Sequence, residues 1–137
     1  MSQINSYLTF NGNCREAMTF YQECLGGELM LQPVEGSPMA NQMPKGMKNC
    51  ILHSTLKTSD FVLMGSDITP ESGLIKGNSH SLIIECNSES QIHELFEKLS
   101  EDGVRRNPIE KTFWGAFFGT FTDKFGHNWM LNFTEKH

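Results

Sequence analysis

Four side chains are of the types that act as general bases or metal ligands, and they lie in two short stretches of the sequence. Cys50 and His53 form a C-x-x-H pair. An imidazole in a pocket can act as a general base or orient a carbonyl group, but the favoured interpretation of His53 is a hydrogen-bonded core histidine. Residues three apart on a strand point to opposite faces, so the pair is not expected to share a metal ion. His80 and Glu85 lie in the second stretch, where Glu85 is either a buried carboxylate facing a pocket or a solvated group at a strand end.

An unusual aromatic stretch follows, with four aromatic residues around two glycines: Thr112-Phe113-Trp114-Gly115-Ala116-Phe117-Phe118-Gly119. One interpretation is a wall or lid of a pocket, in which Trp114 stacks on a planar or cationic group. The other is a strand that enters the sheet core, where glycines allow close backbone approach. A strand with two faces satisfies both interpretations, so Trp114 and Phe118 are candidate ligand contacts.

The composition excludes several classes of function. The 137 residues carry 11 Lys and Arg against 16 Asp and Glu, a net charge of -5. No basic run is present, so no nucleic-acid partner is expected. The apolar runs are far shorter than the roughly 20 residues of a membrane span, so no membrane partner is expected. The first residues lack the basic and apolar regions of a secretory signal, which predicts a cytoplasmic protein whose four cysteines are free thiols.

The elements that position these side chains come from a duplicated unit. Shifting the sequence by 74 positions pairs apolar residues: Leu8 with Leu82, Phe10 with Ile84, Met18 with Ile92, Tyr21 with Leu95 and Leu25 with Leu99. In the first copy, Asn13 is predicted to cap a helix that ends at Gly26-Gly27. In the second copy, Ser88 and Gln91 have the spacing of a capping box, and Gly103 closes the helix.

Strands surround each helix in the same order. Alternation and β-forming residues predict strands at 4–10, 28–34, 50–57 and 61–65 in the first copy, and at 81–86, 104–108, 115–122 and 128–133 in the second. The segment 35–48 is rich in Gly, Pro and Met and is predicted to be a loop over or beside a pocket.

This pattern predicts an α+β fold with two βαβββ modules. Module one is residues 1–67, a linker follows at 68–78, and module two is residues 79–137. One module of about 65 residues would leave a sheet face bare, which favours pairing of the two. We therefore expect two curved mixed sheets that lie side by side and enclose a trough, and a trough is where a ligand binds.

Several segments also carry a family resemblance: 7–18 with Phe20-Tyr21, then 63–67, 112–116 and 123–129. They resemble the vicinal oxygen chelate superfamily of glyoxalases, bleomycin resistance proteins and extradiol dioxygenases, and within it the PhnB-like proteins. The resemblance implies a single glyoxalase-like domain over residues 1–137 and a homodimer.

PhnB-like proteins are often labelled as 3-demethylubiquinone methyltransferase-like, and the residues do not support that label here. The segment Phe10-Asn11-Gly12-Asn13 has one glycine, whereas a nucleotide-like cofactor needs a glycine-rich turn between strand and helix. No S-adenosylmethionine and no other cofactor is expected. The phosphonate connection in the family name is likewise unsupported, because Arg and Lys are not clustered.

Enzymes of the superfamily generally hold a divalent metal with His, Glu or Gln side chains from the first and last strands of each module. The resemblance places these positions at Ser6, at Ser81, at Met130 and within 61–65. None of these residues suits a hard divalent ion, so no metal site of the usual kind is expected. A register shift of one residue brings in His80, but a lone imidazole does not hold a metal.

Three functions stay open. In the first, a metal-free PhnB-like protein binds a small organic molecule in the trough through Ser6, His53, Ser81, Trp114, Phe118 and Met130. In the second, the protein is an enzyme: a lyase, isomerase or dioxygenase with a metal held by His53, His80 and Glu85, or a metal-free enzyme with His53 as base. In the third, it is a sequestering resistance-type protein, for which the net charge of -5 favours cationic ligands.

Overall fold

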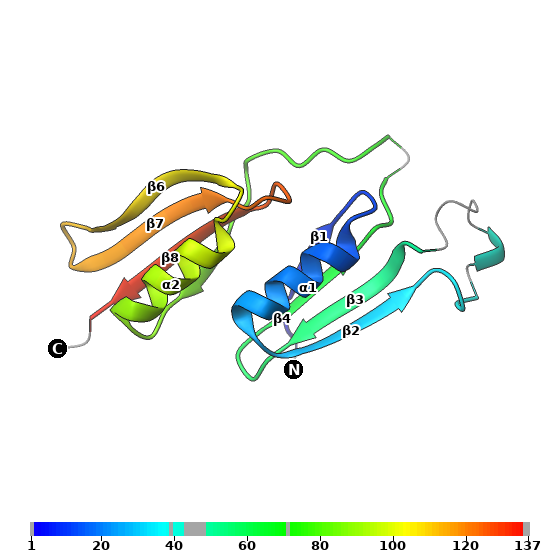
Figure 1. Ribbon diagram of the computed structural model, residues 1–137, viewed down its shortest axis with the longest axis horizontal. Coiled ribbons are helices and arrows are strands. Elements are labelled where there is room, and N and C mark those ends of the chain that lie inside the picture. Colours follow the sequence, from blue (N-terminus) through cyan, green and yellow to red (C-terminus); the bar gives the residue numbers. More distant parts are fainter. Residues whose placement is uncertain (1, 39, 43–48, 71, 136–137) are drawn as a thin grey trace. The chain divides into compact units, whose positions relative to one another are not determined.

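The structure is a computed structural model and describes residues 2–38, 40–42, 49–70 and 72–135. The chain forms two compact units, Met1–Ile75 and Lys76–His137, and their boundary falls inside the predicted linker 68–78. Each unit has one α-helix and one four-stranded sheet (Figure 1). The order βαβββ occurs twice, which confirms the predicted α+β fold and the duplicated modules.

The first unit contains β1 (Ser6–Thr9), α1 (Cys14–Leu25), β2 (Glu28–Pro33), a short 3-10 turn η1 (Ala40–Gln42), β3 (Ile51–Lys57) and β4 (Val62–Ser66). The strand order is β1-β4-β3-β2, with β1 parallel to β4 and the other pairs antiparallel. The helix packs on the sheet through apolar residues at helical spacing, and the core contains Phe10, Met18, Tyr21, Leu56 and Leu63. Part of the predicted loop 35–48 lies outside the described residues.

The second unit contains β5 (Leu82–Glu85), α2 (Glu89–Leu99), β6 (Val104–Lys111), β7 (Ala116–Thr122) and β8 (Asn128–Thr134). The strand order is β5-β8-β7-β6, the same topology as in the first unit. Its core includes Ile92, Phe96, Leu99, Phe121, Trp129 and Leu131. β6 runs past Pro108, where the predicted strand ended, because β6 is an edge strand and a proline there removes no ladder hydrogen bond.

The two helices begin by different means. α2 has the predicted capping box: the Gln91 backbone N–H donates to Ser88 Oγ at 3.0 Å, and the Asn87 N–H donates to Gln91 Oε1 at 2.6 Å. Asn13 occupies the N-cap position of α1, but its side chain makes no capping hydrogen bond. Asp67 supplies the acceptor instead, taking the Cys14 N–H at 3.0 Å. The predicted cap was therefore right in position and wrong in its acceptor.

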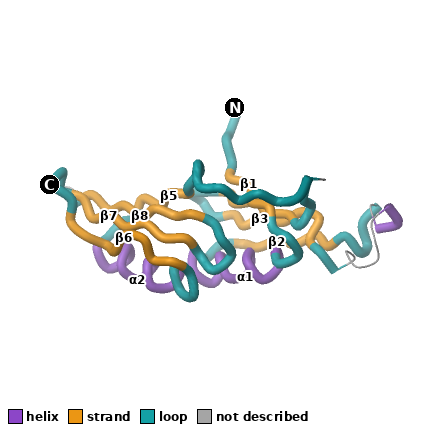
Figure 2. Tube along the Cα trace, turned by 90° about the horizontal axis from the view of Figure 1, so that it is seen from above, coloured by secondary structure: helices purple, strands orange, loops and turns teal. Residues whose placement is uncertain are grey.

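Each helix lies on one side of its own sheet (Figure 2). We call the other side of each sheet the open face. Because side chains alternate along a strand, residues next to a buried core position point to the open face. No described helix is long and apolar enough to cross a membrane.

Candidate functional site

The open face of the first sheet is identified by Gly65. A Cβ at Gly65 would lie 3.0 Å from Met18 Sδ on α1, so Gly65 faces the helix. Its neighbours on β4 therefore face away, and the strand register extends this set across the sheet. One row of the open face consists of Tyr7, Met64, Thr55 and Met30, and the next contains Thr9 paired with Ser66, and His53 paired with Gln32.

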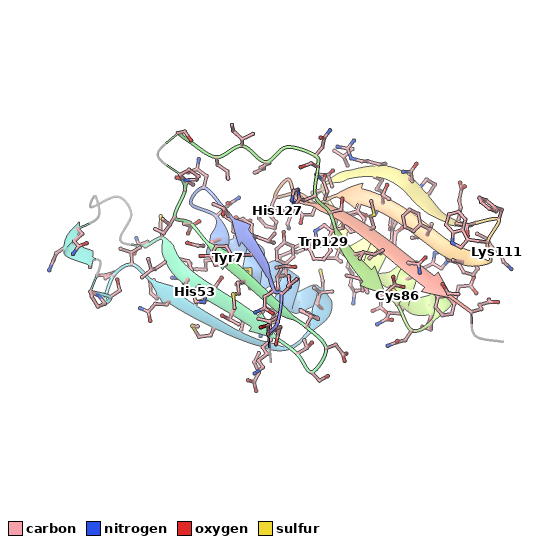
Figure 3. The ribbon with its side chains drawn as sticks, turned by 180° about the vertical axis from the view of Figure 1, so that it is seen from behind. Tyr7, His53, Cys86, Lys111, His127 and Trp129 are labelled. Atoms are coloured by element: carbon pink, nitrogen blue, oxygen red, sulfur yellow. The ribbon has the colours of Figure 1, made fainter. Side chains whose placement is uncertain are left out.

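Tyr7, His53 and Thr55 form a contiguous group on this open face, which we call the Tyr7 cluster (Figure 3). The Tyr7 and His53 rings are stacked, with centroids 6.1 Å apart and planes inclined by 27°. His53 Nε2 lies 3.3 Å from Thr55 Oγ1, a hydrogen bond whose donor depends on the histidine tautomer. Tyr7 is 53% exposed and His53 is half-buried. The candidate base thus lies at a surface rather than among the core side chains.

The open face of the second sheet brings together Phe118 and Met130. The register pairs Ile83 with Met130 and Met130 with Thr120, and it pairs Phe118 with Asn132. On β8, the residues on either side of Met130, Trp129 and Leu131, are buried on the α2 side of the sheet. Ser81 is exposed and, by alternation with Ile83, belongs to the same open face.

Hydrogen bonds between side chains run across this second open face. Asn132 Nδ2 donates to Glu85 Oε2 at 2.8 Å, so Glu85 is a solvated strand-end carboxylate with a neighbouring amide. Asn107 Nδ2 donates to Thr120 Oγ1 at 2.7 Å. Beside Phe118 and Met130, the second open face therefore presents amides, hydroxyls and a carboxylate.

Ser6 does not share a face with His53. The register pairs Ser6 with Leu63, which is 3% exposed and belongs to the core, so Ser6 is on the helix side of the sheet. Tyr7 is the open-face residue of β1, and sequence reasoning missed it. The repeat carried the signal, because the shift of 74 positions pairs Ser81 with Tyr7.

Trp114 stands at the tip of the β6–β7 hairpin beside Phe113. The two rings meet edge to face at 4.9 Å, and they are 59% and 98% exposed. Thr112 closes the turn by donating its N–H to Ala116 O at 2.6 Å, and Gly115 takes a φ of 89°. The other interpretation, a strand that enters the sheet core, applies to β7, which follows the hairpin tip. There Gly119 has no side chain, and Ile109 of the neighbouring strand β6 occupies the space that a Cβ would take.

The residues of the open faces do not fit a metal of the superfamily's usual kind. The first and last strands present Tyr7 and Met64 in one unit, and Ile83 and Met130 in the other. These four side chains are a phenol, an alkyl group and two thioethers, not the imidazoles and carboxylates that hold a divalent ion. The carboxylate of β5, Glu85, lies further along the strand and is hydrogen-bonded to Asn132. Among the described residues, no group of three His, Cys, Asp or Glu side chains could hold a metal.

The alternative set of metal-binding residues, His53, His80 and Glu85, gains no support from the two members that lie in the second unit. His80 is exposed, and its Nδ1 is hydrogen-bonded to Ser79 Oγ at 2.9 Å. Glu85 is five residues further along the chain, so alternation places its side chain on the other side of β5.

The cysteines are free thiols, as predicted, and two of them are buried. Burial raises the pKa of Cys14 and of Cys86 to about 11, and burial also raises the pKa of Cys50. Thiolates are the nucleophilic form, so these three side chains are poor nucleophiles at neutral pH. They act as small apolar residues.

The segment 123–129 forms a buried polar structure. Asp123 Oδ2 accepts the Trp129 indole N–H at 2.8 Å, and Oδ1 accepts the backbone N–H groups of Phe125 and His127. Burial lowers the pKa of His127, and Lys76 lowers it further against the opposing effect of Asp123. These residues fix the turn that leads into β8.

With this geometry established, comparison with known proteins gives the family. The family model described as Glyoxalase/Bleomycin resistance protein/Dioxygenase superfamily matches residues 3–131. The chain belongs to this superfamily. Protein YjdN of Escherichia coli (strain K12) is 31% identical over 138 residues, which cover 94% of this chain and 93% of YjdN.

The chain is also similar to solved structures with the same fold. Protein PA1353 from Pseudomonas aeruginosa is 39% identical with a TM-score of 0.89, covering 99% of this chain and 100% of that one. A PhnB protein from Bacillus cereus, described as a putative 3-demethylubiquinone-9 3-methyltransferase, is 24% identical with a TM-score of 0.77, covering 97% and 100%. The predicted superfamily and the glyoxalase-like fold are therefore confirmed, and the likeness to the PhnB protein is one of fold.

Proposed function

We propose that this superfamily member binds a small organic molecule on the open faces of its sheets without a metal ion. The observation that carries the proposal is the identity of the open-face residues on the first and last strands, where Tyr7, Met64 and Met130 replace metal-binding side chains. Aromatic and thioether surface with a few polar groups is typical of small-molecule sites. Of the predicted contacts, we propose His53 as a binding residue on the open face of the first sheet, and Ser81, Phe118 and Met130 as binding residues on the open face of the second, each face considered by itself.

Metal analysis tests this proposal. Tag-free protein is dialysed against a mixture of divalent metals and then against buffer, and bound metal is measured per chain. We expect far less than one ion per chain, because the paired open-face residues Tyr7 and Met64, and Ile83 and Met130, have no imidazole or carboxylate group.

The control for this measurement is the variant His53→Ala. Near-stoichiometric metal in the wild-type protein that is lost in His53→Ala would contradict the proposal and favour the metal-dependent lyase, isomerase or dioxygenase. Equal, trace amounts of metal in both proteins would support the metal-free site.

We also propose that the protein works in the cytoplasm as a homodimer. Buried free thiols suit a reducing compartment, and exposed apolar side chains away from the open faces, such as Phe113 at 98% at the tip of the β6–β7 hairpin, suit burial against a second copy. Light scattering is expected to give twice the chain mass of 15.5 kDa. A mass of one chain throughout the micromolar range would contradict the dimer.

A further inference from the structure

We propose that the Tyr7 cluster binds a neutral, planar aromatic ring that carries a hydroxyl or carbonyl group. The inference rests on the proposed function and adds a class of ligand and an anchoring residue, Tyr7. It depends on three properties of the two rows of described residues around the Tyr7 cluster: their aromatic and thioether surface, their polar atoms and the absence of charged residues from them.

The surface suits a flat ring. The Tyr7 and His53 rings are stacked within 27° of parallel, and Tyr7 is 53% exposed, so the exposed part of the Tyr7 ring, beside His53, is the surface that a flat ligand contacts. Met64 pairs with Tyr7 and Met30 pairs with Thr55 in the same row, and Met30 is 48% exposed. Thioethers adapt to irregular shapes and contact ring edges favourably, and stacked or edge-to-face rings attract beyond the area they bury.

The polar atoms are few and held in place. The hydrogen bond between His53 Nε2 and Thr55 Oγ1 at 3.3 Å orients the imidazole on the sheet. The second ring nitrogen of His53 and the Tyr7 hydroxyl are then the polar atoms that meet a ligand. Both groups are able to donate or accept, which matches a hydroxyl or a carbonyl oxygen on the ligand.

The charge of this surface selects a neutral ligand. Lys, Arg, Asp and Glu are absent from both rows of described residues that surround the Tyr7 cluster. The charged residues of this face, Glu28 and Lys57, occupy a further row and pair with each other across the strands. A carboxylate or phosphate at the Tyr7 cluster would lose water without gaining a cationic partner, and this loss is costly.

Amide chemical shifts of the full-length, isotope-labelled chain test the inference. The protein is titrated with para-hydroxyacetophenone, a neutral ring with both polar groups. The matched probes are para-hydroxybenzoate, which adds a carboxylate, and the ring-saturated analogue of para-hydroxyacetophenone. We expect shifts at β1, β3 and β4 with the first probe and about three- to tenfold weaker binding of the other two.

Variants then assign the binding to Tyr7. Tyr7→Leu is expected to weaken para-hydroxyacetophenone binding about three- to tenfold, while Tyr7→Phe, which keeps the ring and loses only the hydroxyl, is expected to weaken it by about two- to threefold. Ile75→Ala, at a residue 87% exposed and outside both rows, is the control and should bind like the wild type. The amide spectrum of each variant confirms that it is folded.

Two kinds of outcome overturn the inference. Absence of binding, or shifts confined to residues 76–137, would exclude the Tyr7 cluster as the site. Equal binding by Tyr7→Leu, or tighter binding of para-hydroxybenzoate, would exclude a neutral ligand stacked on Tyr7. These failures differ from failure of the proposed function, which is shown by stoichiometric metal and not by the choice of aromatic probe.

Discussion

Replacing Asp123 with asparagine is expected to lower the free energy of unfolding by roughly 2–4 kcal/mol. The carboxylate is 3% exposed and accepts three hydrogen bonds, from Phe125 N at 2.9 Å, His127 N at 3.0 Å and Trp129 Nε1 at 2.8 Å. An amide has one oxygen, so its NH2 group would face at least one of these donors. A buried donor left without an acceptor carries most of the cost.

Urea unfolding followed by tryptophan fluorescence measures this effect. Both tryptophans, Trp114 and Trp129, lie in the second unit, so the signal reports on the unit that contains Asp123. The matched control is Asp102→Asn, an exposed position at φ 60° that asparagine tolerates, with an expected change within about 0.5 kcal/mol. A change at Asp123 no larger than at Asp102 would show that the three hydrogen bonds contribute little.

Asp123 belongs to the segments that carry the family resemblance, but its role is structural rather than chemical. The segment 123–129 carries part of the resemblance, yet its acidic residue points into the protein and accepts hydrogen bonds from its own turn and indole. The segment positions β8, which presents Met130 on the open face. Asp123 is thus a positioning residue for the candidate site.

The periodicity of the sequence was sufficient to predict the elements of the fold. Within the described part of the chain, both helices and all eight strands lie where apolar spacing and turn residues predicted them, because each sheet buries one face against an amphipathic helix. The repeat also predicted matching topologies. β6 is longer than predicted. The sequence predicted that the strand ends at Pro108, because a proline is tolerated inside a strand only at the edge of a sheet, and the sequence did not show that β6 is an edge strand.

The candidate site was less predictable, because it depends on register and on contacts between distant residues. An offset of one residue put Ser6 in place of Tyr7, and one residue on a strand changes the face. For Trp114 the sequence left two interpretations open, a pocket wall or lid and a strand entering the core; in the structure Gly115 at positive φ turns the chain, and the indole lies at a hairpin tip. Neither the register of β1 nor the position of the indole after the turn at Gly115 follows from the neighbouring residues in the sequence.

Asp67→Asn is the second substitution with a large expected effect, roughly 2–4 kcal/mol of unfolding free energy. Asp67 is 3% exposed; its Oδ1 accepts Gly12 N at 2.9 Å and Cys14 N at 3.0 Å, and its Oδ2 accepts Ile51 N at 2.7 Å. The carboxylate therefore joins the start of α1 to the start of β3. Its charge also lies at the positive end of the helix dipole.

Amide hydrogen exchange is the suitable measurement, because the first unit contains no tryptophan. We expect faster exchange in α1 and β3 of Asp67→Asn, whereas Asp60→Asn, at an exposed position before β4, should exchange like the wild type. Exchange that rises equally in both variants would contradict the anchoring role.

The same experiment connects stability to ligand binding. Ile51 lies two residues before His53 on β3, so loss of the Asp67 hydrogen bond loosens the strand that holds His53 and Thr55. If the Tyr7 cluster is the ligand site, para-hydroxyacetophenone should slow the exchange of β3 in Asp67→Asn, because binding stabilises the ordered strand. Exchange that the probe leaves unchanged would mean that β3 is not part of the binding surface.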